Sequence, residues 1–254
     1  MGNKKSQRKQ KAKRRKTHRL YAFVVIFLAL VIFILGILVL FHVQKIEVTG
    51  NEYCSDQEIV DMVKSDKYSV NTLYILGKYA MGYGEKLPCL ESVKLSLKAP
   101  WSIRITVKEK PIIGYVQGQE DYAYFDKEGL VVYQSPVLIE GLPCIVGVEL
   151  EEIQLYQPLK SEDTQIFEEI LATSQEVTKY GLPTERIVCR EDRIYLYMGQ
   201  VCVSLGNSVS SEKIAQISPI LEKLGEQGGT LHLENYSETN ETITFDMGEL
   251  PEEN

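Results

Sequence analysis

The first 19 residues contain no acidic side chain, although 10 of them are lysine or arginine. The rest of the chain carries the other 18 basic residues and all 35 acidic ones, so the two signs of charge are segregated. The formal net charge of −7 therefore describes neither part. With 44% hydrophobic and 25% charged residues, the composition is that of an ordinary globular protein and excludes wholesale disorder and a polytopic membrane protein.

The next segment also lacks certain residues: Leu20 to Phe41 contains no charged residue, Asn, Gln or Pro. As a helix this run would be about 33 Å long, enough to cross a hydrocarbon core of about 30 Å. We interpret it as an uncleaved signal anchor with its ends at Leu20 and Phe41. A cleaved signal peptide is the alternative, but the run exceeds the roughly 7–15 apolar residues of such peptides and no small-residue cleavage site follows.

The basic tail predicts the orientation of this span. Cations flank its first end and only Lys45 lies close to the other, so the positive-inside rule places Met1–Arg19 in the cytoplasm and residues 43–254 outside. The same cations suit nucleic acid, but topology and attraction to lipid headgroups explain them without that partner. We therefore expect a single-pass membrane protein that binds no nucleic acid.

The cysteines do not indicate a disulfide framework in the external part of the chain. All five cysteines lie there, no C-x-x-C occurs, and an odd number cannot pair completely within one chain. The spacing fits no zinc module, and one bridge remains open as an alternative. The five residues are Cys54, Cys89, Cys144, Cys189 and Cys202.

Catalytic motifs are also missing. The chain has no H-E-x-x-H, G-x-S-x-G, P-loop or dinucleotide-binding motif, and the S-x-x-K at Ser6–Lys9 falls in the tail that we expect to be disordered. We therefore predict no catalytic residue, no cofactor and no metal, and hence a protein that is not an enzyme. An envelope enzyme or ligand sensor acting on cell wall is the rival, with exposed carboxylates as its candidates: Glu151, Glu152, Asp163, Glu168 and Glu169.

A small α+β domain is predicted after the span. Ile46–Thr49 alternates like a strand, Ser55 begins a helix with a capping box, and Asn71 begins a second helix that ends near Gly82. Two alternating runs around Pro100 then predict a hairpin with one buried face. The residues on that face are Val93, Leu95, Leu97, Ala99, Ile103, Ile105 and Val107.

The chain becomes rich in strands beyond Pro111. Tyr122–Phe125 and Leu130–Tyr133 predict a hairpin, with Gly129 where its turn needs positive φ. The further elements that we expect are a short strand within Leu142–Gly147, a helix over Ser161–Tyr180, strands Ile187–Arg190, Arg193–Met198 and Gln200–Leu205, a helix capped by Ser211 and weakened or bent at Pro219, and terminal strands Leu231–Glu234 and Thr242–Phe245. The predicted class is α+β throughout.

The following motifs occur in order along the chain: Ile46–Asn51, Leu87-Pro88, Ala99–Pro111, Tyr124–Val131, Leu142–Gly147 and Val203–Gly206 with nearby Lys213. This set of motifs and the order of the elements resemble the FtsQ/DivIB family of bacterial cell-division proteins, and the small domain is similar to its POTRA (polypeptide-transport-associated) module. Two positions depart from the family pattern, Cys89-Leu90 and His232.

The resemblance implies five segments and a function. The segments are a basic cytoplasmic tail (1–19), a transmembrane helix (20–41), a POTRA-like domain (43–111), a distal β domain (112–246) and an acidic C-terminal stub (247–254). It further implies a divisome scaffold at the septum that binds FtsB/DivIC-type and FtsL-type bitopic proteins outside the cell. That pair regulates septal peptidoglycan synthases, which are therefore candidate partners as well. For the POTRA-like domain, recruitment at the strand Ile46–Thr49 and a rigid spacer are equal alternatives.

The candidate partner-binding residues lie at the end of the chain. The last strand leaves an unpaired row of peptide groups, a template for an incoming strand. We expect strand addition at Thr242, Ile243, Thr244 and Phe245, and the resemblance assigns Tyr236 and Phe245 as aromatic anchors. The alternatives are that the acidic stub covers this edge, or that Ile243 and Phe245 only complete the core.

Overall fold

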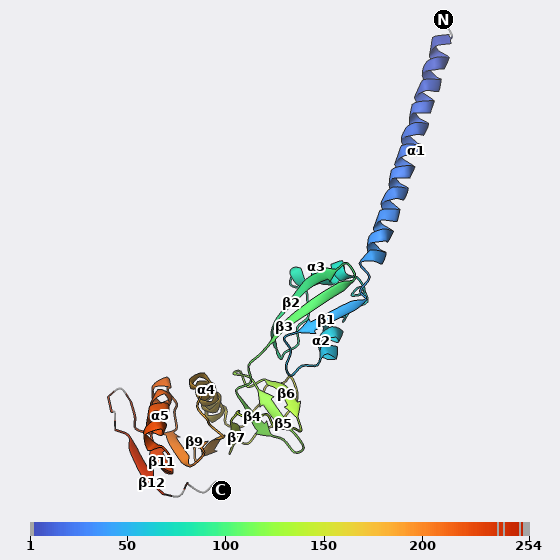
Figure 1. Ribbon diagram of the computed structural model, residues 1–254. Helices are drawn as coiled ribbons and strands as arrows, with labels where there is room; N and C mark the ends of the chain where they lie inside the picture. The colour runs from blue at the N-terminus through green and yellow to red at the C-terminus, as the bar shows by residue number, and fades with distance from the viewer. Residues whose placement is uncertain (1–2, 238, 241, 249, 251–254) are drawn as a thin grey trace. The chain divides into compact units, whose positions relative to one another are not determined.

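The computed structural model describes residues 3–237, 239–240, 242–248 and 250. The chain forms two compact units (Figure 1). The first comprises residues 1–51, 55–87 and 92–107, and the second comprises 52–54, 88–91 and 108–254. Helices and mixed sheets together make an α+β protein, as the sequence predicts.

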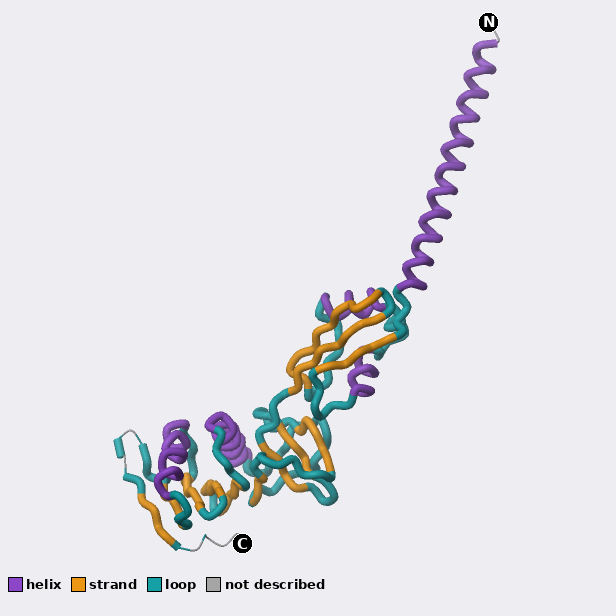
Figure 2. The backbone as a smooth tube through the Cα atoms, in the orientation of Figure 1, coloured by secondary structure: helices purple, strands orange, loops and turns teal. Residues whose placement is uncertain are grey.

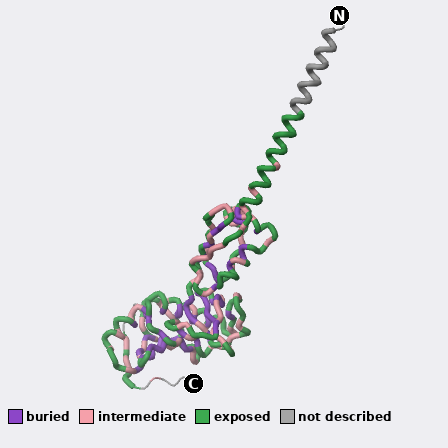
Figure 3. Tube along the Cα trace, turned by 45° about the vertical axis from the view of Figure 1, so that its right-hand side comes forward, coloured by how far each residue is buried: buried purple, intermediate pink, exposed green. Residues whose placement is uncertain are grey.

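Helix α1 (Asn3–Leu40) contains the apolar run. Its segment Leu20–Leu40 is long and apolar enough to cross a membrane, and none of it is buried in the protein (Figure 3). The helix ends one residue before the predicted Phe41, whose N–H still bonds to the Ile37 carbonyl at 2.9 Å. The basic tail is helical from Asn3, contrary to the expected disorder, because a long apolar helix provides the nucleus and Lys, Arg, Gln and Ala propagate it well.

Two helices and a three-stranded sheet form the small domain. The sheet order is β1-β3-β2, with β1 parallel to β3. Both predicted caps are confirmed: Ser55 and Glu58 form the capping box, and Asn71 Oδ1 accepts from the N–H groups of Leu73 and Tyr74. The elements are β1 (Lys45–Thr49), α2 (Asp56–Val63), α3 (Thr72–Ala80), β2 (Leu90–Ala99) and β3 (Ser102–Glu109).

The predicted buried face of this hairpin is correct for β3 and wrong for part of β2. Ile103, Ile105 and Val107 are buried, whereas Leu97 is 45% exposed. Strand β2 is at the edge of the sheet, and alternation predicts which face a side chain occupies but not how far that face is covered.

The second unit is built on a nine-stranded mixed sheet with the order β12-β11-β10-β9-β8-β7-β4-β5-β6. Its elements are β4 (Gly114–Gln117), β5 (Tyr122–Phe125), β6 (Val131–Ser135), β7 (Cys144–Val146), α4 (Thr164–Tyr180), β8 (Arg186–Arg190), β9 (Arg193–Met198), β10 (Val201–Gly206), α5 (Ser211–Leu224), β11 (Gly229–His232) and β12 (Thr244–Met247). Parallel pairs β4–β7, β7–β8 and β10–β11 interrupt the antiparallel ones.

Helices α4 and α5 lie side by side and cover one face of this sheet (Figure 2). Both helices begin at positions that differ slightly from the prediction. Ser161 is held in an extended bridge to Leu150, so Asp163 caps α4 instead. Ser210 caps α5 in place of Ser211, because its hydroxyl accepts from the N–H of Lys213 at 3.3 Å.

Candidate functional site

The last strand, β12, ends the large sheet. It pairs antiparallel with β11, so that Phe245 stands opposite Leu231 and Thr244 opposite His232. Gly229, which begins β11, allows this close approach: its φ is +153°, and a Cβ there would lie 2.2 Å from the Asp246 carbonyl oxygen. In the described part of the chain, no strand pairs with the outer edge of β12.

The hydrogen-bond pattern indicates which peptide groups point outward. The N–H of Gly248 bonds to the Gly228 carbonyl at 3.4 Å. Residues of an antiparallel strand alternate between bonding to the partner strand and pointing away from it, so Thr244 and Asp246 also bond inward. The N–H and C=O groups of Phe245 and Met247 therefore point to the outer edge.

The structure brings the predicted partner-binding residues together but shifts the strand by two residues. Thr244 and Phe245 belong to β12, whereas Thr242 and Ile243 precede it. The N–H of Thr242 bonds to Asn240 Oδ1 at 3.2 Å, which places Thr242 in a turn. Tyr236, Ile243 and Phe245 are half-buried and pack against the main core, so these side chains also complete the fold.

Sequence analysis missed two residues at this edge. Met247 is 76% exposed at the end of β12, and its side chain extends the surface beyond Phe245. Gly229 is the other, and the Gly228-Gly229 pair just before the strand predicted at Leu231–Glu234 is the signal that could have identified it.

A polar hollow of about 680 Å³ adjoins β12. His232 connects the two strands there, with Nδ1 3.0 Å from Glu234 Oε1 and Nε2 3.3 Å from Asp246 Oδ2. Burial disfavours the charged form of Glu234, but hydrogen bonds, including that from His232, outweigh burial and lower its pKa below the ordinary value. The lining residues are Glu191, Asp192, Arg193, Gly206, Asn207, His232, Glu234, Asn235, Thr244 and Asp246.

Lys213 supports this region from inside the protein. Its buried ammonium donates to the carbonyl oxygens of Leu205 at 2.9 Å, Ser208 at 3.0 Å and Glu234 at 3.2 Å. Burial lowers the pKa of Lys213. The three acceptors lie at the end of β10, in the loop before α5 and just after β11, so one side chain fixes the strand ends that surround the hollow.

Three residues of the predicted acidic stub (247–254) are described: Met247, which ends β12, Gly248 and Leu250. Leu250 packs near Val188, Tyr197 and Cys202 on the face of the sheet opposite the helices, rather than on the outer edge of β12. Residues 249 and 251–254 of the stub lie outside the described residues.

The geometry gives little support to the rival enzyme. Of the candidate carboxylates, Asp163 accepts from the N–H of Ile166 at 3.0 Å as a helix cap, and Glu169 accepts from the N–H of Val209 at 3.1 Å. The hollow beside β12 is lined by polar groups rather than by the apolar walls of a typical substrate pocket. All five cysteines are present as thiols in the structure.

Comparisons with known proteins agree with this architecture. The model of the POTRA domain, FtsQ-type, matches residues 41–110. Cell division protein DivIB of Clostridium botulinum strain Hall is 26% identical over 211 residues, covering 79% of this chain and 80% of the relative. The protein of the same name from Clostridium acetobutylicum is 32% identical over 171 residues, covering 65% of this chain and 67% of the relative. An FtsQ-type domain after an apolar helix, together with DivIB relatives that match well beyond it, shows that the chain belongs to the FtsQ/DivIB family of bacterial cell-division proteins.

Proposed function

We propose that this protein is a non-enzymatic scaffold of the division septum that captures a bitopic partner by strand addition at β12. The partner is of the FtsB/DivIC type and is accompanied by an FtsL-type protein, and the assembly regulates septal peptidoglycan synthases. The observation that carries the proposal is the position of β12 at the end of the sheet, with the peptide groups of Phe245 and Met247 pointing outward.

The hollow beside β12 supports a preference for charge in the partner. Four of its lining residues are acidic, Glu191, Asp192, Glu234 and Asp246, against Arg193 and His232. Of these four, Asp246 belongs to β12 itself, so a strand that adds to β12 brings its side chains next to that carboxylate. A Lys or Arg on the partner segment would therefore gain a favourable electrostatic contact, which fixes the register more than it adds affinity.

In this proposal, helix α1 anchors the protein in the membrane. Leu20–Leu40 spans the cytoplasmic membrane, the basic tail stays in the cytoplasm, and residues from 43 onward lie outside as the POTRA-like domain (43–111) and the distal domain (112–246). Confinement of both partners to one membrane raises their effective concentration, so a modest edge contact suffices for capture. The POTRA-like domain acts as a spacer or recruits a further membrane protein through β1.

The test removes one outward N–H group without touching the ladder to β11. Met247→Pro deletes the N–H that points to the incoming strand, and proline is tolerated in edge strands at such positions. We expect capture of the DivIC-type and FtsL-type proteins of the same bacterium, co-expressed with the full chain, to fall about tenfold or more. Met247→Ala is the matched control, because it removes the side chain and keeps the N–H.

Capture by Met247→Pro at the level of Met247→Ala would refute strand addition at this edge. This pair is more decisive than Phe245→Lys, because Phe245 packs against the core and its replacement also disturbs folding. Fluorescent fusions separate the function from the mechanism: absence of the full-length protein from midcell would contradict the septal role itself.

A further inference from the structure

Helix α3 exposes an apolar surface to solvent. Lys78 is the only charged residue among its nine, and its ammonium faces the domain, 2.8 Å from Asp66 Oδ2. Leu73 and Tyr74 are each more than 40% exposed. A surface helix of a soluble protein normally presents a polar face to water, so α3 is unusual for an exposed helix.

Neighbouring segments extend this surface. We call Tyr68, Val70, Leu73 and Trp101 the apical patch; all four are more than 40% exposed. The rings of Tyr68 and Tyr74 lie 5.7 Å apart. Trp101 is brought to the same end of the domain because the neighbouring Pro100 carbonyl accepts from the Thr72 hydroxyl at 2.6 Å.

The apical patch is bonded directly to the residues that follow the apolar helix. The Phe41 carbonyl accepts from the N–H of Thr72 at 2.8 Å, and the N–H of Val43 bonds to the Val70 carbonyl at 2.9 Å. The N–H of Gln44 bonds to the Trp101 carbonyl at 2.9 Å. Phe41 comes one residue after the end of α1, so these contacts leave no linker between the span and the patch.

Chain length then limits how far the patch can lie from the hydrocarbon. Gln44 is four residues beyond Leu40, which corresponds to at most about 14 Å even when fully extended. The N–H of Thr72 bonds to the Phe41 carbonyl, so Thr72 lies closer still to the hydrocarbon. The interfacial layer on each side of a bilayer core is roughly 5–8 Å thick, so the patch begins within or beside it, whatever the tilt of the helix.

The small domain and the large one differ in their balance of charge. Residues 43–110 contain 10 basic and 9 acidic side chains, whereas residues 111–254 contain 8 basic and 26 acidic ones. Anionic headgroups therefore repel the large domain and not the small one. Lys67 stands at the patch, with Nζ 4.9 Å from the Tyr68 ring centre, and offers a cation to the same headgroups.

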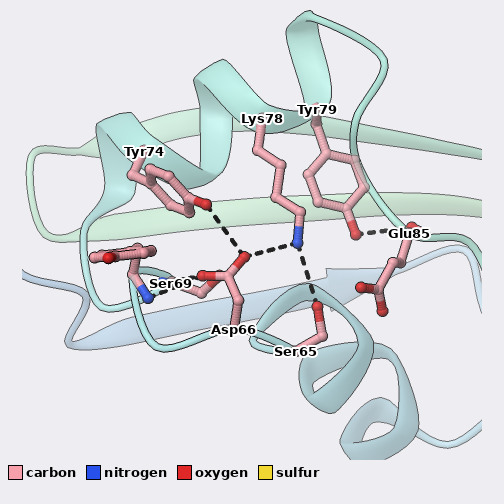
Figure 4. A network of polar contacts seen from close by, with 8 residues as sticks. Ser65, Asp66, Ser69, Tyr74, Lys78, Tyr79 and Glu85 are labelled. Carbon is pink, nitrogen blue, oxygen red and sulfur yellow. Dashed lines mark hydrogen bonds and ion pairs between the residues drawn. The ribbon is translucent and has the colours of Figure 1, made fainter.

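A polar network fixes the loop that carries the patch (Figure 4). Asp66 Oδ1 accepts from the N–H groups of Tyr68 at 2.9 Å and Ser69 at 3.0 Å. Lys78 and the Tyr74 hydroxyl both point toward Asp66 Oδ2, at 2.8 Å and 3.3 Å. The exposed rings are thus held in place before any contact forms, which reduces the entropy cost of binding.

We propose that the apical patch lies in the headgroup layer of the bilayer that α1 crosses, so that the small domain docks on the lipid surface beside its own span. The partner is the lipid itself, with anionic headgroups near Lys67. Tyr and Trp side chains favour this layer because one end is apolar and the other is polar. The inference rests on the proposed anchoring by α1, and the experiment separates the two.

Trp101 is the only tryptophan of the chain and is therefore a native probe. The full-length protein is reconstituted into vesicles of phosphatidylcholine and phosphatidylglycerol, and flotation with the vesicles verifies anchoring. We expect blue-shifted Trp101 emission, quenched about twofold or more by a nitroxide high on the lipid acyl chain and protected from aqueous iodide. Leu73→Glu should reverse both effects without unfolding the domain, because Leu73 is exposed.

The matched control moves the probe to the large domain. Tyr180→Trp in a Trp101→Phe background places a tryptophan at a site whose present side chain is 41% exposed, close to the 42% of Trp101, and it should remain open to iodide. Flotation with Trp101 open to iodide would overturn docking and leave anchoring intact. Failure to float would overturn both. Protection of Trp101 only after a DivIC-type partner is added would assign the patch to a protein and overturn the lipid contact.

Discussion

His232 on β11 is joined through its imidazole Nε2 to Asp246 Oδ2 on β12 at 3.3 Å, while its Nδ1 meets Glu234 at 3.0 Å. Strand β12 has only four residues, so its backbone ladder is short. This side-chain link therefore adds to the attachment of the edge strand on which the proposed function depends.

His232→Leu should loosen β12 selectively. A partly exposed pair of this kind contributes about 0–1 kcal/mol, which corresponds to at most about fivefold in a local opening equilibrium. We expect faster hydrogen exchange of the β12 amides, measured by mass spectrometry on the full chain, with unchanged exchange in β9 and β10. Equal protection of β12 in both proteins would show that the imidazole does not hold the strand.

Gly229→Ala should displace β12 more strongly. The added Cβ would lie 2.2 Å from the Asp246 carbonyl oxygen, and a φ of +153° is unfavourable for any other residue. We expect a cost of about 1–3 kcal/mol in the free energy of unfolding, together with loss of partner capture. Gly228→Ala is the control, since its Cβ meets nothing closer than 3.1 Å. Similar unfolding midpoints for the two variants would contradict the close-approach argument.

Local signals predicted most of the fold. Ser55 and Asn71 cap α2 and α3 as expected, because a cap depends on side-chain groups within three residues. The helix predicted over Ser161–Tyr180 stops at Gly181, which has a φ of +62°. The strands predicted over Ile187–Arg190 and Arg193–Met198 are joined by Glu191 and Asp192, which both have positive φ. Each of these features needs only neighbouring residues to form.

The sequence pattern did not predict how segments far apart in the chain come together. The parallel pairing of β10 with β11 brings Val203 beside Leu231 across the intervening helix α5, and no local signal encodes that register. The hollow likewise collects residues from separate strands and loops. The shift of β12 has a similar cause, because the bond from the Thr242 N–H to Asn240 withdraws Thr242 from the ladder although its β propensity suits a strand.

Lys213→Met should destabilise the distal domain although it preserves the length and apolar stem of the side chain. The variant leaves the carbonyl oxygens of Leu205, Ser208 and Glu234 without their donor in a buried setting. We expect a loss of about 1–3 kcal/mol, measured by urea unfolding of the detergent-solubilised chain. Lys213→Arg retains charge and donors and should recover part of the loss. Full stability of Lys213→Met would mean that water replaces the ammonium.

Asp66 should make the small domain sensitive to acid. The hydrogen bond from Lys78 is the main cause that lowers the pKa of Asp66 to about 2, against its ordinary value of 3.8, although burial opposes it. Because the folded state holds this proton more weakly than the unfolded chain, the stabilisation is complete above about pH 4 and disappears as the pH falls toward 2. The thermal midpoint of Asp66→Asn should therefore lie below that of the wild type at pH 6, and the gap should close between pH 4 and pH 2. Lys78→Met removes the other partner of the same ion pair. Its thermal midpoint should therefore also change less than that of the wild type between pH 4 and pH 2. A gap of constant size across this range would show that Asp66 stabilises the loop by geometry alone and not by its charge.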